Sequence, residues 1–212
     1  KGKASKDPDN WSEYVQLMKD AKIPDWFIGS CQKIKYMFPK AHAAAYVISA
    51  FRIAWFKVHM PVYYYASWLS TKATDFNVEA MIKGYDAIKE AIIEISNKGN
   101  EATNKDAGVS ESLYLALEAT ARGIKFENVN LYKSEATTFG VKDDKTIYPP
   151  FNSIDGLGDT VAKNIVSERE KREFISIEDL QKRCKISTTL IDKMRLMGIL
   201  DGMDESSQLS LF

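Results

Sequence analysis

The stretch FPKAHAAAY, residues 38–46, lies at the centre of a longer segment, residues 26–74, that contains no acidic residue. The whole chain carries 29 basic and 29 acidic residues, so this segment is a local positive region in a neutral protein. Pro39 suits the first position of a helix, where its missing N–H costs nothing. The next N–H groups can then face an anion, with the positive end of the helix dipole behind them. The pattern favours phosphate binding at this helix start, where Lys40 and His42 lie in the first turn.

A nearly apolar helix is predicted to follow over residues 40–57. Arg52 and Lys57 interrupt it, and at this length it is not a membrane span. Four residues recur at three- and four-residue steps and therefore share one stripe of the helix, namely His42, Tyr46, Ser49 and Ile53. That stripe could line a site that Lys40 also reaches. Periodicity alone favours the alternative, a core helix with a hydrogen-bonded histidine and a buried tyrosine.

The remaining patterns predict a mainly α fold with a small α+β region. Helices are expected over residues 11–20, from Pro24 onward, and over 63–69, 77–96 and 110–122. Asn10 and Glu13 form a capping-box pattern at the first of these. Residues 97–108 are predicted to be a solvated loop, and residues 137–149 a β-hairpin around Asp143 and Asp144.

A Gly-x-Gly turn, Gly156-Leu157-Gly158, lies between a predicted short helix and a longer one. Its glycines let the backbone approach a phosphate, and N–H groups at the start of the second helix can donate to it. The pattern, which continues through Thr160 and Lys163, resembles a helix-hairpin-helix motif, although an ordinary corner between two helices remains the alternative. Contacts of this kind reach the DNA backbone and carry no direct sequence information.

A second, degenerate copy of the motif follows, over residues 177–184 and 187–197, closed by Gly198. Because it lacks the Gly-x-Gly turn, we expect it to be mainly a packing partner for the first copy. Residues 151–212 contain nine basic and eleven acidic residues, so DNA contact is expected to be focal. Besides the turn, it would involve Lys163, Lys171 and Arg172.

The fingers domain of bacterial replicative DNA polymerase III alpha subunits closely resembles the segment from Tyr36 through FPKAHAAAY and on to YYYA at residues 63–66. The sequence is more similar to the PolC branch than to the DnaE branch, and the resemblance covers essentially the whole chain. It implies a fingers domain over residues 1–74 and a helical connector with the β-hairpin over 75–150. A tandem helix-hairpin-helix region over 151–203 and a clamp-binding tail over 204–212 would follow.

The resemblance also implies roles for particular residues. The incoming deoxynucleoside triphosphate, or an inhibitor that competes with it, would contact five residues, Lys1, Lys3, Lys40, His42 and Tyr46. Primer–template DNA would contact Gly156, Gly158, Thr160 and Lys163. The end of the chain is similar to the bacterial peptide that binds the sliding clamp, so Gln208, Leu209, Leu211 and Phe212 would bind the clamp. Taken alone, such a terminal pentapeptide reads as a frayed tail.

No catalytic or metal-binding residue is predicted within this chain. The resemblance places the palm aspartates that hold two Mg²⁺ ions, and the proofreading exonuclease, upstream of Lys1. The absence of an initiator methionine fits a fragment of a larger enzyme, with the palm, thumb and exonuclease as its other parts. With two isolated cysteines and no signal peptide or membrane-length apolar stretch, a cytoplasmic location is expected.

Two other classes of protein remain open from the sequence. An independent DNA-binding or architectural protein would use the hairpin motif and leave the pattern around Lys40 unexplained. A structural adaptor would use the aromatic helix only as core. Nucleotide binding at the Lys40 end would separate both classes from the polymerase interpretation.

Overall fold

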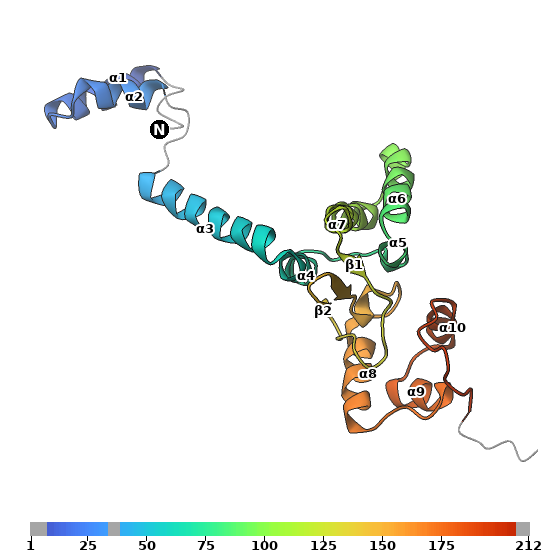
Figure 1. Ribbon diagram of the computed structural model, residues 1–212. Coiled ribbons are helices and arrows are strands. Elements are labelled where there is room, and N and C mark those ends of the chain that lie inside the picture. Colours follow the sequence, from blue (N-terminus) through green and yellow to red (C-terminus); the bar gives the residue numbers. More distant parts are fainter. Residues whose placement is uncertain (1–7, 34–38, 207–212) are drawn as a thin grey trace, which may run out of the picture. The chain divides into compact units, whose positions relative to one another are not determined.

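The computed structural model describes residues 8–33 and 39–206, and this part of the chain is mainly helical (Figure 1). The first helices are α1 (Pro8–Asp20), α2 (Asp25–Lys33), α3 (Lys40–His59) and α4 (Pro61–Thr71). They are followed by α5 (Val78–Lys83), α6 (Tyr85–Asn97), η2 (Gly99–Glu101) and α7 (Asn104–Ala121). Three strands come next, β1 (Lys125–Phe126), β2 (Gly140–Asp143) and β3 (Thr146–Tyr148). The last elements are η3 (Phe151–Ser153), α8 (Asp159–Lys171), α9 (Ile177–Cys184) and α10 (Thr188–Leu196).

The chain divides into two compact units, Lys1–Arg52 and Ile53–Phe212, and the boundary lies within α3. In the first unit, α1 and α2 contact each other, and Ile28 and Cys31 of α2 are buried. The four-part division predicted from the sequence, at residues 74, 150 and 203, stays a prediction.

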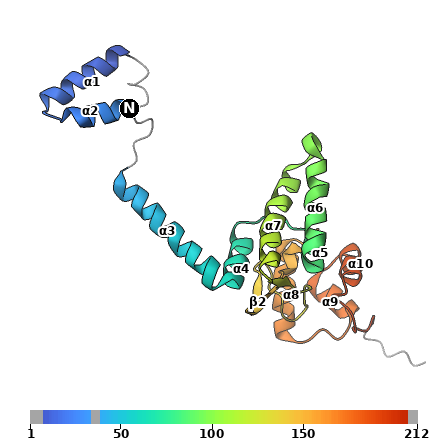
Figure 2. The ribbon, with the colours of Figure 1, turned by 45° about the horizontal axis from the view of Figure 1, so that its top comes forward.

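The second unit is built around two apolar cores. In the first, α6 and α7 lie side by side (Figures 1 and 2), and α4 contacts both α7 and the sheet. Helix α4 buries Val62, Tyr65, Ala66 and Leu69, which recur at three- and four-residue steps on one helix face. The other large buried side chains of this core include Met81, Ile88, Leu113 and Ile147.

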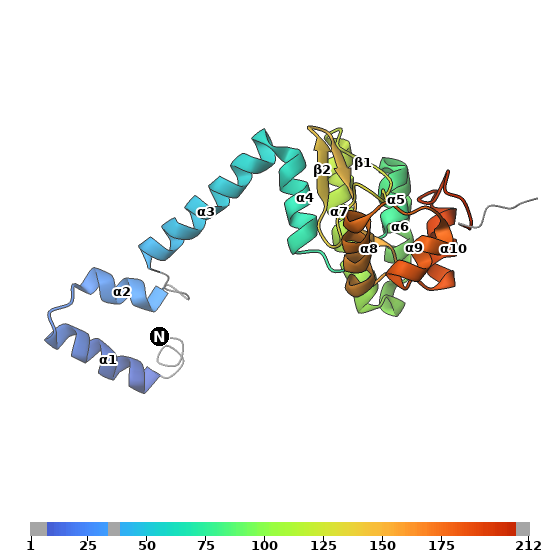
Figure 3. The same cartoon turned by 90° about the horizontal axis from the view of Figure 1, so that it is seen from below.

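Residues of η3, α8, α9 and α10 form most of the second core, which we call the hairpin core. Helices α8, α9 and α10 are labelled in Figure 3. The fully buried members of the hairpin core include Phe151, Ile154, Ile165, Leu180, Ile191 and Met194. Val78 of α5 belongs to the hairpin core, whereas its neighbours Ala80 and Met81 belong to the first core. Helix α5 therefore packs against both cores at once.

The predicted β-hairpin is confirmed, because β2 and β3 pair antiparallel, with an irregular register between Val141 and Asp143. The sequence analysis missed β1, which pairs parallel with β3 and completes the strand order β1-β3-β2. The N–H groups of Lys125 and Glu127 donate to the carbonyls of Lys145 and Ile147 at 2.7 and 2.9 Å. A strand of two residues has no periodicity of its own, so only its partner reveals it.

Two of the predicted helix starts were wrong. Helix α1 begins at Pro8, because proline is favourable in the first helical turn. Asn10 therefore lies inside the helix rather than at its cap. Helix α7 begins at Asn104, within the predicted loop, because Thr103 and Asp106 form a reciprocal capping box.

The predicted single helix over residues 77–96 is two helices, α5 and α6. Gly84 separates them with a φ of +93°, a backbone conformation that favours glycine. The Asn77 side chain caps α5 by accepting a hydrogen bond from the N–H of Ala80 at 3.0 Å. The short helix predicted before Gly156 is the single 3₁₀ turn η3.

Candidate nucleic-acid interface

The Gly-x-Gly turn connects η3 to α8 with its apolar residues inward and its glycines outward. Ile154 and Leu157 are buried in the hairpin core, whereas Gly156 and Gly158 are exposed. The Leu157 N–H donates to the Ile154 carbonyl at 2.9 Å, which closes the turn. Gly156 has a φ of +88°, so a side chain there would strain the backbone. The turn is thus held from inside and presents bare backbone outside.

Helix α8 begins without a side-chain cap. Gly158 is its N-cap residue, and no side chain accepts a hydrogen bond from the first turn. A Cβ atom at Gly158 would meet no atom within 4 Å, and the φ of −76° is open to any residue. The first N–H groups of a helix have no carbonyl of their own helix to bond. This helix start therefore offers accessible backbone donors.

Helix α8 turns apolar residues inward and the proposed DNA-contact residues outward. Ala162 and Ile165 are buried in the hairpin core, whereas Thr160 and Lys163 are exposed. Thr160 lies in the first turn and Lys163 about one turn further along the same helix. The proposed DNA-contact residues Gly156, Gly158, Thr160 and Lys163 are therefore brought together on an exposed part of the turn and of α8. Their roles stay predictions.

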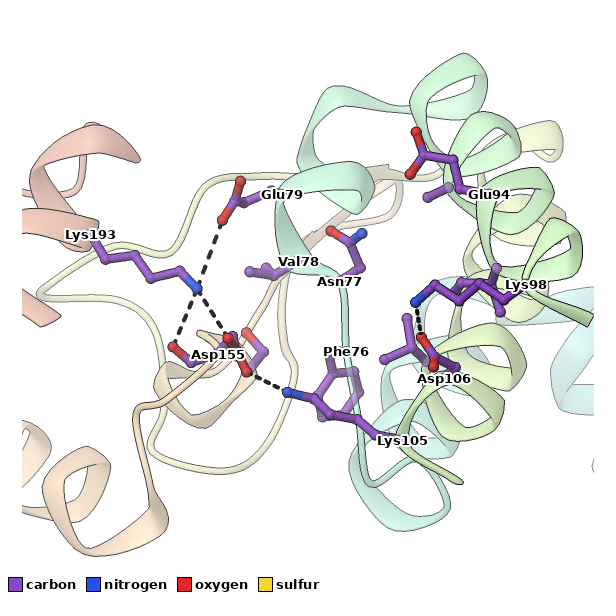
Figure 4. Close-up of a pocket in the computed structure, with 14 residues that line it drawn as sticks. Phe76, Asn77, Val78, Glu79, Glu94, Lys98, Lys105, Asp106, Asp155 and Lys193 are labelled. Atoms are coloured by element: carbon purple, nitrogen blue, oxygen red, sulfur yellow. Dashed lines mark hydrogen bonds and ion pairs between the residues drawn. The ribbon is translucent and has the colours of Figure 1, made fainter. Parts of the chain in front are cut away.

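Acidic groups limit the positive charge beside the turn. The Asn152 side-chain amide donates to the Asp159 carboxylate at 3.0 Å, at the first residue of α8. Asp155 forms ion pairs with Lys105 of α7 at 2.6 Å and with Lys193 of α10 at 3.6 Å (Figure 4). The hydrogen bond from Lys105, with the charges of both lysines, holds the pKa of the Asp155 carboxyl below its ordinary value. These acidic groups are consistent with the expectation that any DNA contact is focal, and that expectation stays a prediction.

A cavity of about 370 Å³ lies beside this ion-pair cluster (Figure 4). Phe76, Asn77 and Glu79 line it from one side, and Lys105, Asp155 and Lys193 also face it. Lys193 Nζ is 4.0 Å from the Glu79 carboxylate and donates to the Asp155 carbonyl at 3.3 Å. The cluster therefore ties the turn to α5, α7 and α10. Sequence reasoning missed it, because the four side chains come from distant parts of the chain.

The second copy of the motif differs at its helix starts. Ser176 and Ser187 cap α9 and α10 by accepting hydrogen bonds from the N–H groups of Asp179 and Leu190, at 3.1 and 3.3 Å. Lys185, with a φ of +56°, replaces the glycine turn. A methyl carbon of Leu190 would lie 3.6 Å from a Cβ at Gly156, so α10 packs close to the first turn. These contacts support the expectation that the second copy is mainly a packing partner.

Arg183 of α9 fastens the two copies to each other. Its guanidinium forms ion pairs with Glu168 at 3.2 Å and Asp179 at 3.2 Å, and it lies 4.5 Å from the centre of the Phe174 ring. It also donates to main-chain carbonyls at the end of α8, including that of Glu168. Lys171 and Arg172, which the sequence analysis also considered for DNA contact, form ion pairs with Glu168 and Asp179.

The predicted nucleotide-binding residues that the structure describes lie together at the start of α3. Pro39 precedes the first helical residue, Lys40, and its carbonyl accepts a hydrogen bond from the N–H of Ala43 at 3.1 Å. The rings of His42 and Tyr46 lie edge to face, with centroids 4.5 Å apart, as expected for one stripe. Lys1 and Lys3 lie outside the described residues.

Helix α3 has no buried residue in this chain. Tyr46 is 67% exposed and Phe51 is 73% exposed. The alternative of a core helix with a buried tyrosine is therefore wrong for the chain as described. The apolar side chains of α3 are not buried against any other described element.

The C-terminal end of α3 is fixed to α7 within the second unit. Lys57 Nζ lies 2.8 and 2.9 Å from the two carboxylate oxygens of Glu118. Arg122 lies 3.4 Å from the same carboxylate and donates to the Lys57 carbonyl at 3.5 Å. Burial raises the pKa of the Tyr65 hydroxyl, which lies beneath this cluster, and the Glu118 charge raises it further.

The predicted clamp-binding residues, Gln208, Leu209, Leu211 and Phe212, lie outside the described residues. Residues 204–206, which the sequence analysis assigned to the clamp-binding tail, are hydrogen-bonded to the start of α9. Among residues 8–33 and 39–206, no three His, Cys, Asp or Glu side chains cluster in a way that could hold a metal ion. In the same ranges, no helix combines the length and the apolar character that crossing a membrane requires.

Fold and turn geometry together define a helix-hairpin-helix region, and residues 123–209 match the helix-hairpin-helix motif family. The chain is also similar to several longer proteins. It is 52% identical to the "DNA polymerase III PolC-type" of Halalkalibacterium halodurans over 200 residues, which cover 94% of the chain. It is 50% identical to the protein of the same name from Oceanobacillus iheyensis over 212 residues, and 50% identical to that from Bacillus subtilis over 200 residues.

These alignments cover nearly the whole chain but only 14% of each of these three relatives. With about half of its residues identical along that length, the chain is a homologue of one segment of these PolC-type DNA polymerase III proteins. The family resemblance seen in the sequence is therefore confirmed.

Proposed function

We propose that this chain is part of a DNA-directed DNA polymerase and holds primer–template DNA through the Gly-x-Gly turn. The observation that carries the proposal is the start of α8, where Gly158 leaves backbone donors accessible and no side chain caps the helix. The homology to PolC-type polymerases supports the proposal, because the homology extends over α3 as well as the hairpin. An independent hairpin protein would not need the α3 sequence.

The chemistry of the contact follows from the donors. Phosphate oxygens would accept hydrogen bonds from the N–H groups at the start of α8, where the helix dipole also favours a negative charge. Lys163 would add one positive charge about one turn further along. Such contacts grip the DNA backbone without reading its sequence.

At the start of α3, we propose that Lys40 and His42 contact the phosphates of the incoming deoxynucleoside triphosphate, with Lys1 and Lys3 as further ligands. Tyr46 would pack near the new base pair. A nucleotide-competitive inhibitor would use the same residues. The family resemblance assigns the two Mg²⁺ ions to the palm of the parent polymerase, outside this chain. The palm, thumb and exonuclease are the other expected parts of that enzyme.

We propose that Gln208, Leu209, Leu211 and Phe212 bind the sliding clamp. Leucine and phenylalanine would fill an apolar pocket of the clamp, while the glutamine amide fixes the register. Replication in the cytoplasm fits this set of partners.

The decisive experiment changes Gly158 in the complete polymerase and measures primer–template binding. Because the backbone at Gly158 tolerates any residue and the space beyond it is open, Gly158→Val should fold normally but keep DNA away from the helix start. Binding should weaken uniformly across template sequences, and Gly158→Ala should give a smaller loss. The logarithm of the binding constant falls with the logarithm of the salt concentration, and Lys163→Ala should reduce the steepness of this slope by about one.

A folded Gly158→Val polymerase that binds primer–template with unchanged affinity would contradict the proposal. A loss confined to particular template sequences would also contradict it, because backbone contacts do not discriminate bases directly.

A further inference from the structure

The last described residues, Asp204, Glu205 and Ser206, form a strap across the start of α9. The carbonyls of Asp204 and Glu205 accept hydrogen bonds from the N–H groups of Ile177 and Glu178 at 2.9 and 3.1 Å. These are the first two N–H groups of α9, which have no partner within the helix. The strap therefore completes the capping of α9 that Ser176 begins.

Side chains fasten the strap as well. Glu205 forms an ion pair with Arg195 of α10, and the Ser206 hydroxyl donates to the Glu178 carboxylate at 2.8 Å. The chain is thus bound to α9 and α10 as far as Ser206.

This anchoring limits how far the terminal peptide can reach. Gln208 is only two residues beyond Ser206, and Phe212 is six residues beyond it. A six-residue segment spans at most about 20 Å even when fully extended. Whatever protein binds residues 208–212 must come that close to the start of α9 and the end of α10.

Two exposed apolar side chains lie close in sequence to the residues that hold the strap. Leu196, next to Arg195, is 90% exposed, the highest value among the large apolar side chains of the described residues. Ile175, two residues before Ile177, is 57% exposed. Exposure of apolar side chains to water is unfavourable. A partner that covers them removes this apolar surface from water, which stabilises the complex.

We propose that the protein that binds the terminal peptide also covers Leu196 and Ile175, so that its interface continues from the tail onto the strap region. This inference rests on the proposed clamp binding of residues 208–212. The short tether places that partner beside the strap, and the two apolar side chains give it a second contact. The clamp would then be held at a fixed place next to the hairpin region.

The test measures binding of the purified sliding clamp to the complete polymerase. The double variant Leu196→Ser with Ile175→Ser keeps residues 208–212 intact and should weaken clamp binding at least fivefold. Ile93→Ser is the matched control, because Ile93 is a 48% exposed apolar residue of α6, outside the hairpin region, and it should change the affinity less than twofold. All three positions are exposed, so the variants should fold normally. Leu196→Glu should weaken binding further than Leu196→Ser.

Phe212→Ala separates this inference from the proposed function. If Phe212→Ala weakens clamp binding and the double variant behaves like Ile93→Ser, the second contact is refuted while the tail assignment stands. If Phe212→Ala has no effect, clamp binding by the tail is refuted, and the inference falls with it.

Discussion

Glu118 of α7 holds Lys57, near the end of α3, through both oxygens of its carboxylate, at 2.8 and 2.9 Å. The two residues are 61 positions apart, and their side chains are only about one-third exposed. Arg122 joins the same carboxylate from the next turn of α7 and also donates to the Lys57 carbonyl. This ion-pair cluster fixes the last turn of α3 to the body of the second unit.

Breaking this pair should cost measurable stability. In a double-mutant cycle with Lys57→Met and Glu118→Gln, we expect a coupling in the free energy of unfolding of up to about 1 kcal/mol, since partial exposure screens the charges. The matched control is Lys142 with Glu127, an ion pair in which both side chains are about 40% exposed. Urea unfolding of the 212-residue chain measures both cycles, and a larger coupling for the control pair would contradict this ranking.

The same carboxylate predicts how stability depends on pH. Partial burial alone would raise the pKa of Glu118, but the hydrogen bond from Lys57 and the charges of Lys57 and Arg122 outweigh it, so the pKa lies below its ordinary value. The stabilisation is therefore complete above the pKa of the unfolded chain and is lost as the pH falls through the lower folded pKa. Glu118→Gln should reduce the loss of thermal stability on acidification. Melting curves from neutral to acidic pH measure this, and an unchanged acid dependence would rule Glu118 out as a contributor.

The elements that the sequence predicted well carry strong local signals. Pro24 precedes α2, Asp143 and Asp144 mark the hairpin turn, and Gly156 marks the turn before α8. The errors have local causes too. The break at Gly84 was overlooked within a continuous helical pattern, and the Thr103–Asp106 capping box lay in a segment that its polar composition suggested was a loop.

The candidate site was predictable only where its residues are close in sequence. Gly156, Gly158, Thr160 and Lys163 share one turn and one helix, and the structure brings them together. The pairing of Asp155 with Lys105 and Lys193 depends on how three elements pack, so no spacing in the sequence encodes it. The strap over α9 escaped prediction for the same reason. No local pattern in residues 204–206 indicates that their carbonyls cap a helix 27 residues earlier in the chain.

The helix start at Lys40 predicts a nucleotide effect. In the complete polymerase, Lys40→Ala should raise the apparent KM for deoxynucleoside triphosphates about tenfold or more, because a charge-assisted contact contributes about 1.5–3 kcal/mol. Lys72→Ala, which removes an exposed lysine after α4, is the control and should leave KM unchanged. Steady-state primer extension at varied nucleotide concentration gives both values. Unchanged KM and kcat in Lys40→Ala would reject the assignment.

Tyr46 lies one turn beyond His42 and is 67% exposed in this chain, so its removal should hardly affect folding. Tyr46→Ala should reduce both the rate of incorporation and the discrimination against wrong nucleotides, since aromatic stacking on a base contributes about 1–3 kcal/mol. Tyr46→Phe keeps the ring and should remain close to wild type. Single-nucleotide incorporation with matched and mismatched templates tests this. Normal speed and fidelity in Tyr46→Ala would show that the ring does not contact the base pair.

The terminal peptide should contribute clamp binding chiefly through Phe212, its largest apolar side chain. Filling an apolar pocket with one phenylalanine contributes about 1.5–3 kcal/mol, so Phe212→Ala should weaken clamp binding at least tenfold. Without the clamp, the variant should extend primers normally, because the proposed nucleotide and DNA contacts do not include the tail. The measurement is product length on a long template with the clamp loaded, for the wild type and for a chain that ends at Ser207. Ending there keeps Asp204, Glu205 and Ser206, so the cap on α9 is preserved and any loss is due to the peptide itself. Equal product lengths would mean that clamp contact lies elsewhere in the polymerase.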